Sequence, residues 1–124
     1  MREKHVLDTY VIGEAKTYRM DNHWRGLIIK EIEPAASKLV RKNIPLSIKL
    51  SFYLHKSRIS KVDIDNLCKS VLDALDLSGL YADDSLVHNL EASKISIDDS
   101  DPEGVRIQAW EWTIESSQTS ENPR

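Results

Sequence analysis

Two aspartates, Asp63 and Asp65, stand two residues apart near the middle of the chain. In an extended segment, residues i and i+2 point to the same side, so both carboxylates can face one point. Carboxylates held close together repel each other unless a cation or a proton lies between them. Hard divalent cations prefer carboxylate oxygens, and Mg²⁺ commonly takes one or two carboxylates together with water and phosphate oxygens. The spacing therefore suits a divalent-metal site that acts on a phosphate.

Basic residues lie on both sides of this pair. Lys69 follows Asp65 by one turn of the predicted helix and shares its face. A lysine beside a metal and a phosphate can stabilise charge that develops on the phosphoryl group. The connector before Asp63 could hold phosphates through the charges of Lys56, Arg58 and Lys61. A basic approach to an acidic centre is what a metal-dependent nuclease needs.

A second aspartate pair, Asp83 and Asp84, follows a glycine at position 79. The helix predicted between the two pairs has about 14 residues and a length of roughly 21 Å. Asp84 is therefore far from Asp63 unless the chain returns along a strand or a loop. The sequence permits this return, but the spacing alone does not demonstrate it.

Ordinary structural roles compete with these interpretations. Asp65 alone is more often a helix N-cap than a metal ligand. Asp83 and Asp84 alone would form a solvated turn. The basic residues of the connector, Lys56, Arg58 and Lys61, would form a solvent-exposed loop. A calcium-binding loop is excluded, because Leu67 and Cys68 occupy positions that require a ligand and a glycine.

Length and composition indicate one folded domain. The chain has 124 residues, of which 40% are hydrophobic and 30% charged, with a net charge of −3. Its single cysteine, Cys68, excludes an internal disulfide and a zinc site of several cysteines, and fits a reducing cytoplasm. No signal-peptide pattern or long apolar run is visible, so we expect no membrane segment. We expect a domain at residues 1–115 and a polar, disordered tail at 116–124.

The apolar spacing predicts the order strand, helix, strand, helix, strand, strand. The second helix is expected to have Asp65 as its N-cap and Gly79 at its end, and Pro34 should kink or divide the first helix. We expect an α/β protein of the α+β type, with two helices on a small mixed sheet closed by a carboxy-terminal hairpin. The strands are predicted at 5–13, 45–55, 87–97 and 105–114, and the first helix at 23–40.

The last predicted strand contains an irregularity and two tryptophans. Its apolar phase changes between Ala109 and Trp110, which indicates a bulge or a strand covered on both faces. Trp110 and Trp112 lie two residues apart on one strand face. We expect them in the core or in a dimer interface, with base stacking as the alternative.

The central segment resembles the RusA family of Holliday junction resolvases. DIDNLCKSVLDAL, then Gly79, the aspartate pair, Val87 and Lys94, follow that family's D-x-D-N-x-x-K-x-x-x-D-x-L segment, glycine turn, aspartate pair and later lysine. The similarity covers roughly residues 63–94, about a quarter of the chain, and lies in order and spacing as well as composition. The basic connector and the element order are also similar, whereas the amino-terminal third matches only loosely.

The resemblance implies a homodimeric endonuclease that resolves four-way DNA junctions by paired nicks and uses Mg²⁺, or Mn²⁺ in its place, as its only cofactor. By position it implies the catalytic residues Asp63, Asp65, Lys69 and Asp84. The metal ligands would be Asp63, Asp65 and Asp84, with Asp83 as a further member, and Asp73 would give structural support. The implied contacts to DNA are made by Lys56, Arg58, Lys61 and Lys94.

Three other functions remain open at this point. One is a flap or branched-DNA nuclease of phage type, and another is an acidic metal-binding or protein-interaction domain. The third is a catalytically silent module that binds DNA junctions. The silent module is disfavoured because it would need neither the carboxylates nor the lysine of the central segment.

Overall fold

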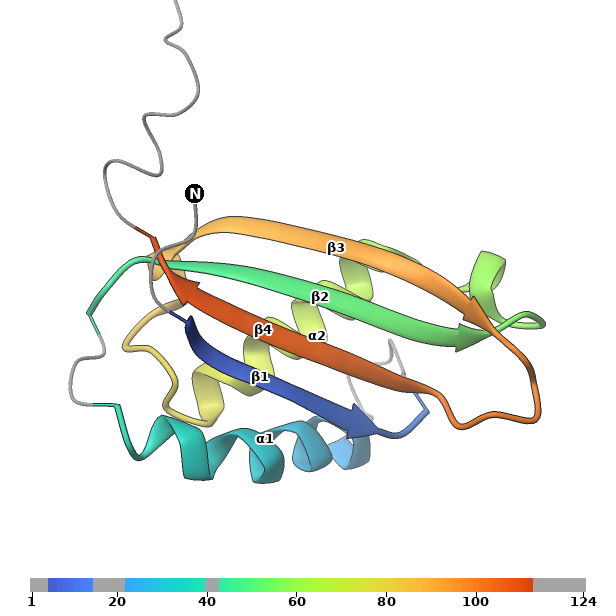
Figure 1. Ribbon diagram of the computed structural model, residues 1–124, viewed down its shortest axis with the longest axis horizontal. Coiled ribbons are helices and arrows are strands. Elements are labelled where there is room, and N and C mark those ends of the chain that lie inside the picture. The colour runs from blue at the N-terminus through green and yellow to red at the C-terminus, as the bar shows by residue number, and fades with distance from the viewer. Residues whose placement is uncertain (1–4, 15–21, 40–42, 113–124) are drawn as a thin grey trace, which may run out of the picture.

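The strands and helices of the computed structural model follow the predicted order (Figure 1). The structure describes residues 5–14, 22–39 and 43–112. Two short 3-10 helices flank the second long helix. The elements in chain order are β1 (His5–Ile12), α1 (Asn22–Ala36), β2 (Leu46–His55), η1 (Ile59–Lys61), α2 (Ile64–Leu77), η2 (Asp84–Leu86), β3 (Val87–Ile97) and β4 (Gly104–Glu111). This confirms the predicted α+β architecture; the tail at 116–124 lies outside the described residues.

The four strands of the described chain form one mixed sheet in the order β1-β4-β2-β3. β3 runs parallel to β2, and β4 runs antiparallel to both β2 and β1. The predicted carboxy-terminal hairpin is therefore wrong, because β2 lies between β3 and β4. Two parallel neighbours need a crossover connection, and α2 supplies it between β2 and β3.

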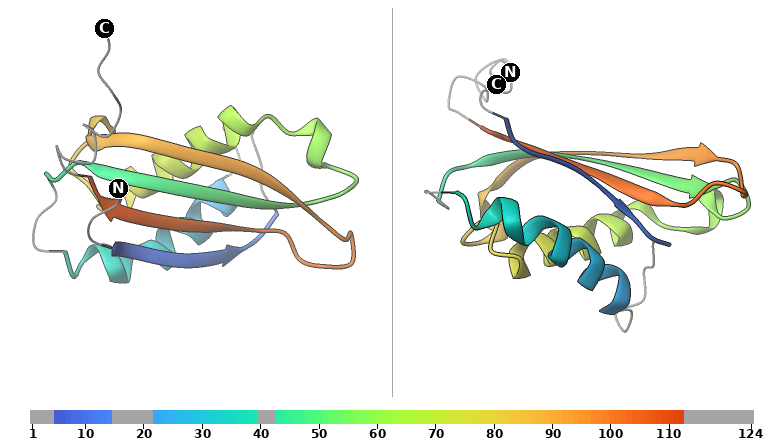
Figure 2. Two further views of the ribbon diagram at one scale, coloured as in Figure 1. Left: turned by 45° about the horizontal axis from the view of Figure 1, so that its top comes forward. Right: turned by 60° about the horizontal axis from the view of Figure 1, so that its bottom comes forward.

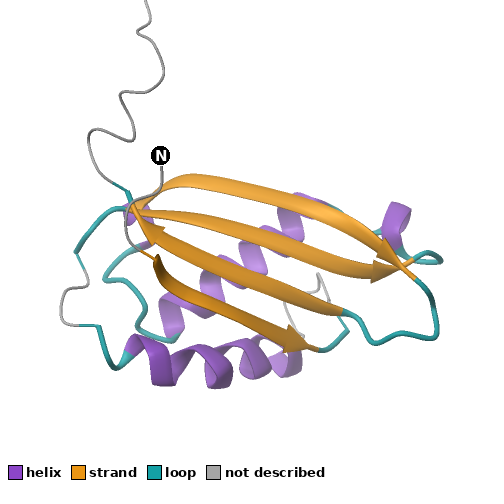
Figure 3. Cartoon of the chain, viewed as in Figure 1, coloured by secondary structure: helices purple, strands orange, loops and turns teal. Residues whose placement is uncertain are grey.

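Both long helices cover the same face of the sheet, as the two layers in Figures 2 and 3 show. Alternate residues of β2 point toward the helices, so their side chains are fully buried. Side chains spaced three or four positions apart on α1 and α2 pack against these side chains of β2. The fully buried apolar residues of β2 are Ile48, Leu50, Phe52 and Leu54, and the helices contribute, among others, Trp24, Ile28, Ile32, Leu67, Val71 and Leu75.

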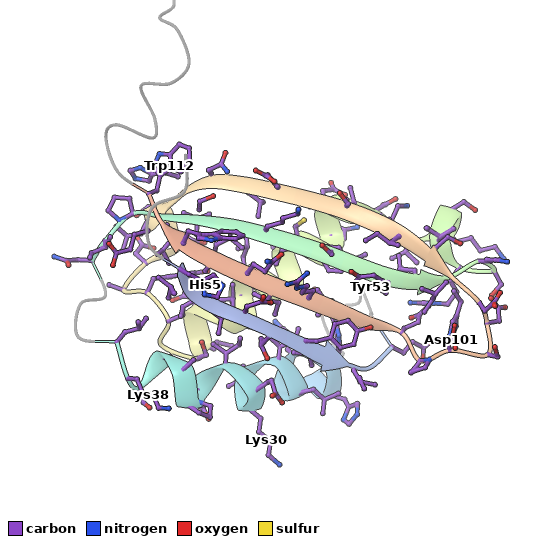
Figure 4. All side chains as sticks on the ribbon, in the orientation of Figure 1. His5, Lys30, Lys38, Tyr53, Asp101 and Trp112 are labelled. Atoms are coloured by element: carbon purple, nitrogen blue, oxygen red, sulfur yellow. The ribbon has the colours of Figure 1, made fainter. Side chains whose placement is uncertain are left out.

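The other face of the sheet carries aromatic and charged residues. Arg106 of β4 and Asp8 of β1 form an ion pair with 2.7 Å between Nη2 and Oδ2. The rings of His5 and Trp110 pack edge to face, with 5.8 Å between their centroids. Figure 4 labels His5 and Tyr53 on this face. Neither Trp110 nor Trp112 belongs to the buried core, so that part of the prediction is wrong. Their place in a dimer interface stays a prediction.

Local details of the two long helices and of the bulge differ from the predicted ones. Pro34 lies inside α1 without dividing it, and the helix ends two residues later. Asp63, not Asp65, is the N-cap of α2. Asp65 lies in the first turn, where a negative charge interacts favourably with the helix dipole. The predicted bulge exists, but its extra residue, Val6, lies on β1, opposite Trp110 and its neighbour.

Candidate active site

The amino-terminal end of α2 presents two exposed carboxylates, and both accept hydrogen bonds from one residue, Asn66. Asp63 has an extended backbone in the N-cap position, and Asp65 follows it in the first turn. The side-chain amide of Asn66 donates to Asp63 Oδ2 at 3.4 Å, and the Asn66 backbone N–H donates to Asp65 Oδ1 at 3.0 Å. Asn66 was not predicted as a site residue, although its place directly after the two aspartates was a usable signal.

A hollow of about 530 Å³ opens between α2 and β3. Asp65 and Lys69 both line it, which confirms the prediction that they share one helical face. Its floor is mainly aliphatic. The other lining residues are Ile64, Cys68, Leu72, Asp73, Asp84, Leu90 and Ala92. We call Asp65 and Lys69, together with Asp63 just outside the lining, the lysine end of this hollow.

Cys68 lies in the wall of the hollow, and its side chain is largely buried. Burial, reinforced by the nearby charge of Asp65, raises the pKa of its thiol. A thiol with a raised pKa stays protonated near neutral pH and is a poor nucleophile. Cys68 is therefore a packing residue rather than a catalytic one.

Lys94 holds the connector that precedes the lysine end. Its ammonium group donates to the carbonyl oxygens of Ile59 at 2.6 Å and Val62 at 2.8 Å. Val62 is followed directly by Asp63, so these hydrogen bonds fix the backbone that presents the first carboxylate. Lys94 was expected to contact DNA; that contact stays a prediction, and the structure gives the side chain a positioning role.

Arg58 is tied to a buried carboxylate. Its Nε and Nη2 atoms each donate to Glu103 at 3.1 Å, and the backbone N–H of His55 donates to the same carboxylate at 2.8 Å. Burial acts to raise the pKa of Glu103, but the hydrogen bonds and charges of Arg58 and His55 outweigh it and lower the pKa. Arg58 therefore anchors the connector, and its predicted contact with DNA is untested.

The two other connector lysines lie on the surface. The ammonium group of Lys56 lies 3.1 Å from Asp98 Oδ1, and both side chains are well exposed. Lys61 is exposed at the end of η1. An exposed ion pair contributes little to stability, so Lys56 can exchange its partner for a DNA phosphate at small cost.

A buried tyrosine brings the second aspartate pair to the later half of α2. Tyr81 Oη donates to the carbonyl oxygen of Leu72 at 2.9 Å, and Gly79, with φ of 83°, allows the preceding turn. Burial raises the pKa of the Tyr81 phenol, and neighbouring carboxylates raise it further. These carboxylates, which we call the acidic end, belong to Asp73, Asp76, Asp83 and Asp84.

Within the acidic end, Asp83 is engaged locally. Its Oδ2 accepts a hydrogen bond from Ser85 Oγ at 2.8 Å, and this bond lowers the pKa of the Asp83 carboxyl despite some desolvation. Asp84 instead lines the hollow. Of the two, Asp84 is the better placed to act on a ligand.

The lysine end and the acidic end are far apart within one chain. Val62 is fixed to Lys94, whereas Asp84 precedes Val87, and the seven residue steps of β3 between Val87 and Lys94 span about 23 Å. Figure 2 shows η1 and η2 at opposite ends of β3. The expectation that Asp84 lies beside Asp63 within the chain is therefore wrong. Among the described residues, no three His, Cys, Asp or Glu side chains are grouped so that they could hold a metal ion.

A small α+β domain with paired carboxylates and a lysine at a helix start has the features of a phosphodiester-cleaving enzyme. Residues 3–108 match the family model described as Endodeoxyribonuclease RusA, and the chain belongs to this family. The family identifies a DNA-binding endonuclease of the Holliday junction resolvase type, which confirms the resemblance seen in the sequence. No curated protein matches the chain. Among the described residues, no helix is long and apolar enough to cross a membrane.

Proposed function

We propose that this protein is a homodimeric, metal-dependent nuclease of the cytoplasm that resolves four-way DNA junctions by paired nicks. The observation that carries the proposal is the pair Asp63 and Asp65, joined by Asn66, with Lys69 one helical turn further on the same wall. The family assignment supplies the substrate class, which is branched DNA. A dimer with twofold symmetry presents two equivalent sites to two strands of the junction.

The residues of the lysine end fit a hard divalent cation. Two exposed carboxylates supply oxygen ligands, and Mg²⁺ takes its remaining ligands from water and substrate phosphate. Asp63 and Asp65 would hold the ion, and Mn²⁺ should replace Mg²⁺ because both accept oxygen ligands. When bound, the ion would activate a water molecule and stabilise the leaving oxygen.

The other side chains would position and stabilise the DNA. Lys69 projects from the wall of the hollow, and its ammonium group would stabilise negative charge on the phosphate under attack. Lys61 and Lys56 would hold the flanking backbone through charge. The expected product carries a 5′-phosphate at each nick. Asp84 is proposed as a further metal ligand with Asp83 beside it, although Asp84 cannot reach the same ion within one chain.

Comparison of branched substrates tests the proposal. A labelled four-way junction, a flap and a plain duplex of matched sequence should be incubated with Mg²⁺, Mn²⁺ or Ca²⁺, and the cuts mapped at nucleotide resolution. We expect paired, symmetric cuts in the junction with Mg²⁺ or Mn²⁺, and binding without cutting in Ca²⁺. Preferential cutting of the flap would favour the flap-nuclease alternative. Binding of the junction without any cutting would favour a silent binding module.

A further inference from the structure

We propose that the connector before Asp63 contains a phosphate-binding site, and that the acidic turn between β3 and β4 (residues 98–101) occupies this site until DNA displaces it. The donors of the site are the ammonium group of Lys56 and the backbone N–H of Ser57. This inference rests on the DNA binding that the proposed function requires. It adds a backbone donor to the expected DNA contacts and a competitor for DNA that the protein itself supplies.

Carboxylates of the turn take the donors that a phosphate would use. Asp98 Oδ1 lies 3.1 Å from the ammonium group of Lys56, and Asp99 Oδ1 accepts a hydrogen bond from the backbone N–H of Ser57 at 3.4 Å. Hydrogen bonding by Ser57 lowers the pKa of the Asp99 carboxyl, although desolvation opposes it. Lysine side chains and backbone N–H groups are donors that proteins commonly offer to DNA phosphates. Carboxylate oxygens therefore stand where phosphate oxygens would bind.

The backbone of the turn is held beside the connector, whereas its carboxylates stay exposed. The backbone N–H of Lys56 donates to the carbonyl oxygen of Ile97 at 3.0 Å, and that of Asp101 donates to the carbonyl oxygen of Asp98 at 3.0 Å. Nε2 of His55 lies 2.6 Å from the carbonyl oxygen of Asp101. The side chains of Lys56 and Asp98 are 69% and 65% exposed, so their ion pair adds little stability and can exchange for a phosphate.

The turn offsets the positive charge of the connector. Arg58 is engaged by the buried carboxylate of Glu103, so the exposed cations of the connector are Lys56 and Lys61. Figure 1 shows the turn, η1 and the ends of β2 and β3 together at one end of the sheet. At physiological ionic strength, exposed charges interact appreciably within about 8 Å. The turn therefore weakens the attraction of the connector for DNA through three exposed acidic residues: Asp98, Asp99 and Asp101.

Removing the charges of the turn should tighten DNA binding. The double variant Asp98→Asn/Asp99→Asn keeps the shape of both side chains but removes their negative charges. We expect its Kd for a four-way junction in Ca²⁺ to fall by at least about 5-fold at physiological ionic strength, because like charges leave the neighbourhood of the bound phosphates. The gain in affinity should shrink as the salt concentration rises. Fluorescence anisotropy with a labelled junction measures both effects.

A variant with the same change in net charge separates a local effect from a global one. Glu31→Gln/Glu33→Gln removes two exposed carboxylates from α1. This helix ends shortly before Lys38, which Figure 4 places at the end of the molecule opposite Asp101. We expect the Kd of this control to change by less than about 2-fold. Equal tightening in both double variants would overturn the proposal, and so would an unchanged Kd for Asp98→Asn/Asp99→Asn.

A double-mutant cycle identifies the donor that the turn occupies. In a Lys56→Gln chain, the gain in affinity from Asp98→Asn/Asp99→Asn should be clearly smaller, because the ammonium group for which carboxylate and phosphate compete is absent. Equal gains with and without Lys56 would overturn the assigned site. Cleavage of the junction by the wild type in Mg²⁺ is measured alongside. Wild-type protein that cuts but shows no effect of the turn refutes this inference alone, whereas protein that binds with the expected gain but never cuts refutes the nuclease function.

Discussion

At the residue scale, the structure gives each member of the central motif a distinct role. Asn66 links the two carboxylates, Lys69 shares the wall of the hollow with Asp65, and Lys94 fixes the backbone before Asp63. Lys94 therefore positions the backbone that leads to the site. Its contact with DNA stays a prediction. The chemistry is expected to reside in exposed groups whose positions are set by better buried ones.

Replacing one carboxylate should separate cleavage from binding. Asp65→Asn removes a charge and a metal ligand but keeps the side-chain shape, so we expect a loss of cleavage of at least about 100-fold with Mg²⁺. Junction binding should be unchanged or tighter, because repulsion of phosphate decreases. Initial cleavage rates and a gel-shift titration measure the two effects. Glu31→Gln, an exposed charge on α1, is the matched control, and full activity of Asp65→Asn would refute its assignment.

The buried carboxylate of Glu103 should make stability depend on pH. Its pKa is lower in the folded protein than in the unfolded chain, so its contribution is present above about pH 4.3 and is lost as the pH falls through the folded pKa. Glu103→Gln should reduce the free energy of unfolding by about 2 kcal/mol at pH 7, because Arg58 loses a charged partner.

Urea denaturation at pH 7 and near pH 3 measures this effect. The difference between Glu103→Gln and the wild type should shrink at the lower pH. Asp98→Asn, which alters only the exposed pair with Lys56, serves as the control and should change stability little. A difference that stays constant with pH would show that the charge of Glu103 is not responsible.

At the scale of elements, the connection from α2 to β3 decides where Asp84 lies. The helix ends at Leu77, Gly79 adopts a positive φ, and the chain then passes through the buried residues Leu80 and Tyr81. Tyr81 fixes the turn to the helix through the carbonyl oxygen of Leu72. This hydrogen bond keeps the acidic end next to the later half of α2 and away from Asp63.

Removing the hydrogen bond of Tyr81 should disturb the position of Asp84 more than it lowers the stability of the protein. Tyr81→Phe deletes the hydrogen bond to Leu72 while keeping the ring, so we expect a stability loss of about 1 kcal/mol. Cleavage should fall further than stability explains, because Asp84 loses its fixed position. Thermal unfolding and cleavage rates measured below the melting transition test this. Tyr53→Phe, on the other face of the sheet, is the control; equal loss of activity in both variants would contradict the proposed role.

At the scale of the whole molecule, a net charge of −3 must be reconciled with DNA binding. Local charge matters more than the total, and the connector carries Lys56, Arg58 and Lys61 next to the lysine end. Arg58 is engaged by Glu103, so fewer cations are available to phosphates than the sequence suggests. Divalent cations at the carboxylates should therefore contribute to binding as well as to cleavage.

The salt dependence of junction binding tests this balance. With about two exposed lysines contacting phosphate in each protomer, a dimer should show a slope of log K against log salt of roughly −3 to −4. Lys61→Ala should reduce the magnitude of this slope by about two per dimer, whereas Lys30→Ala on α1 should leave it unchanged. Fluorescence anisotropy in Ca²⁺ at several salt concentrations measures it. An unchanged slope for Lys61→Ala would exclude a phosphate contact at this position.

The sequence by itself determined the order of the elements, most of their boundaries, the shared face of Asp65 and Lys69, and the family. These features are local: apolar periodicity and spacing along one helix fix them without reference to distant residues. The tertiary structure alone decided that β2 separates β3 from β4, that Glu103 engages Arg58, and that Asp84 lies away from Asp63. Each of these depends on which strands become neighbours, and strand order is set by packing between segments far apart in the sequence.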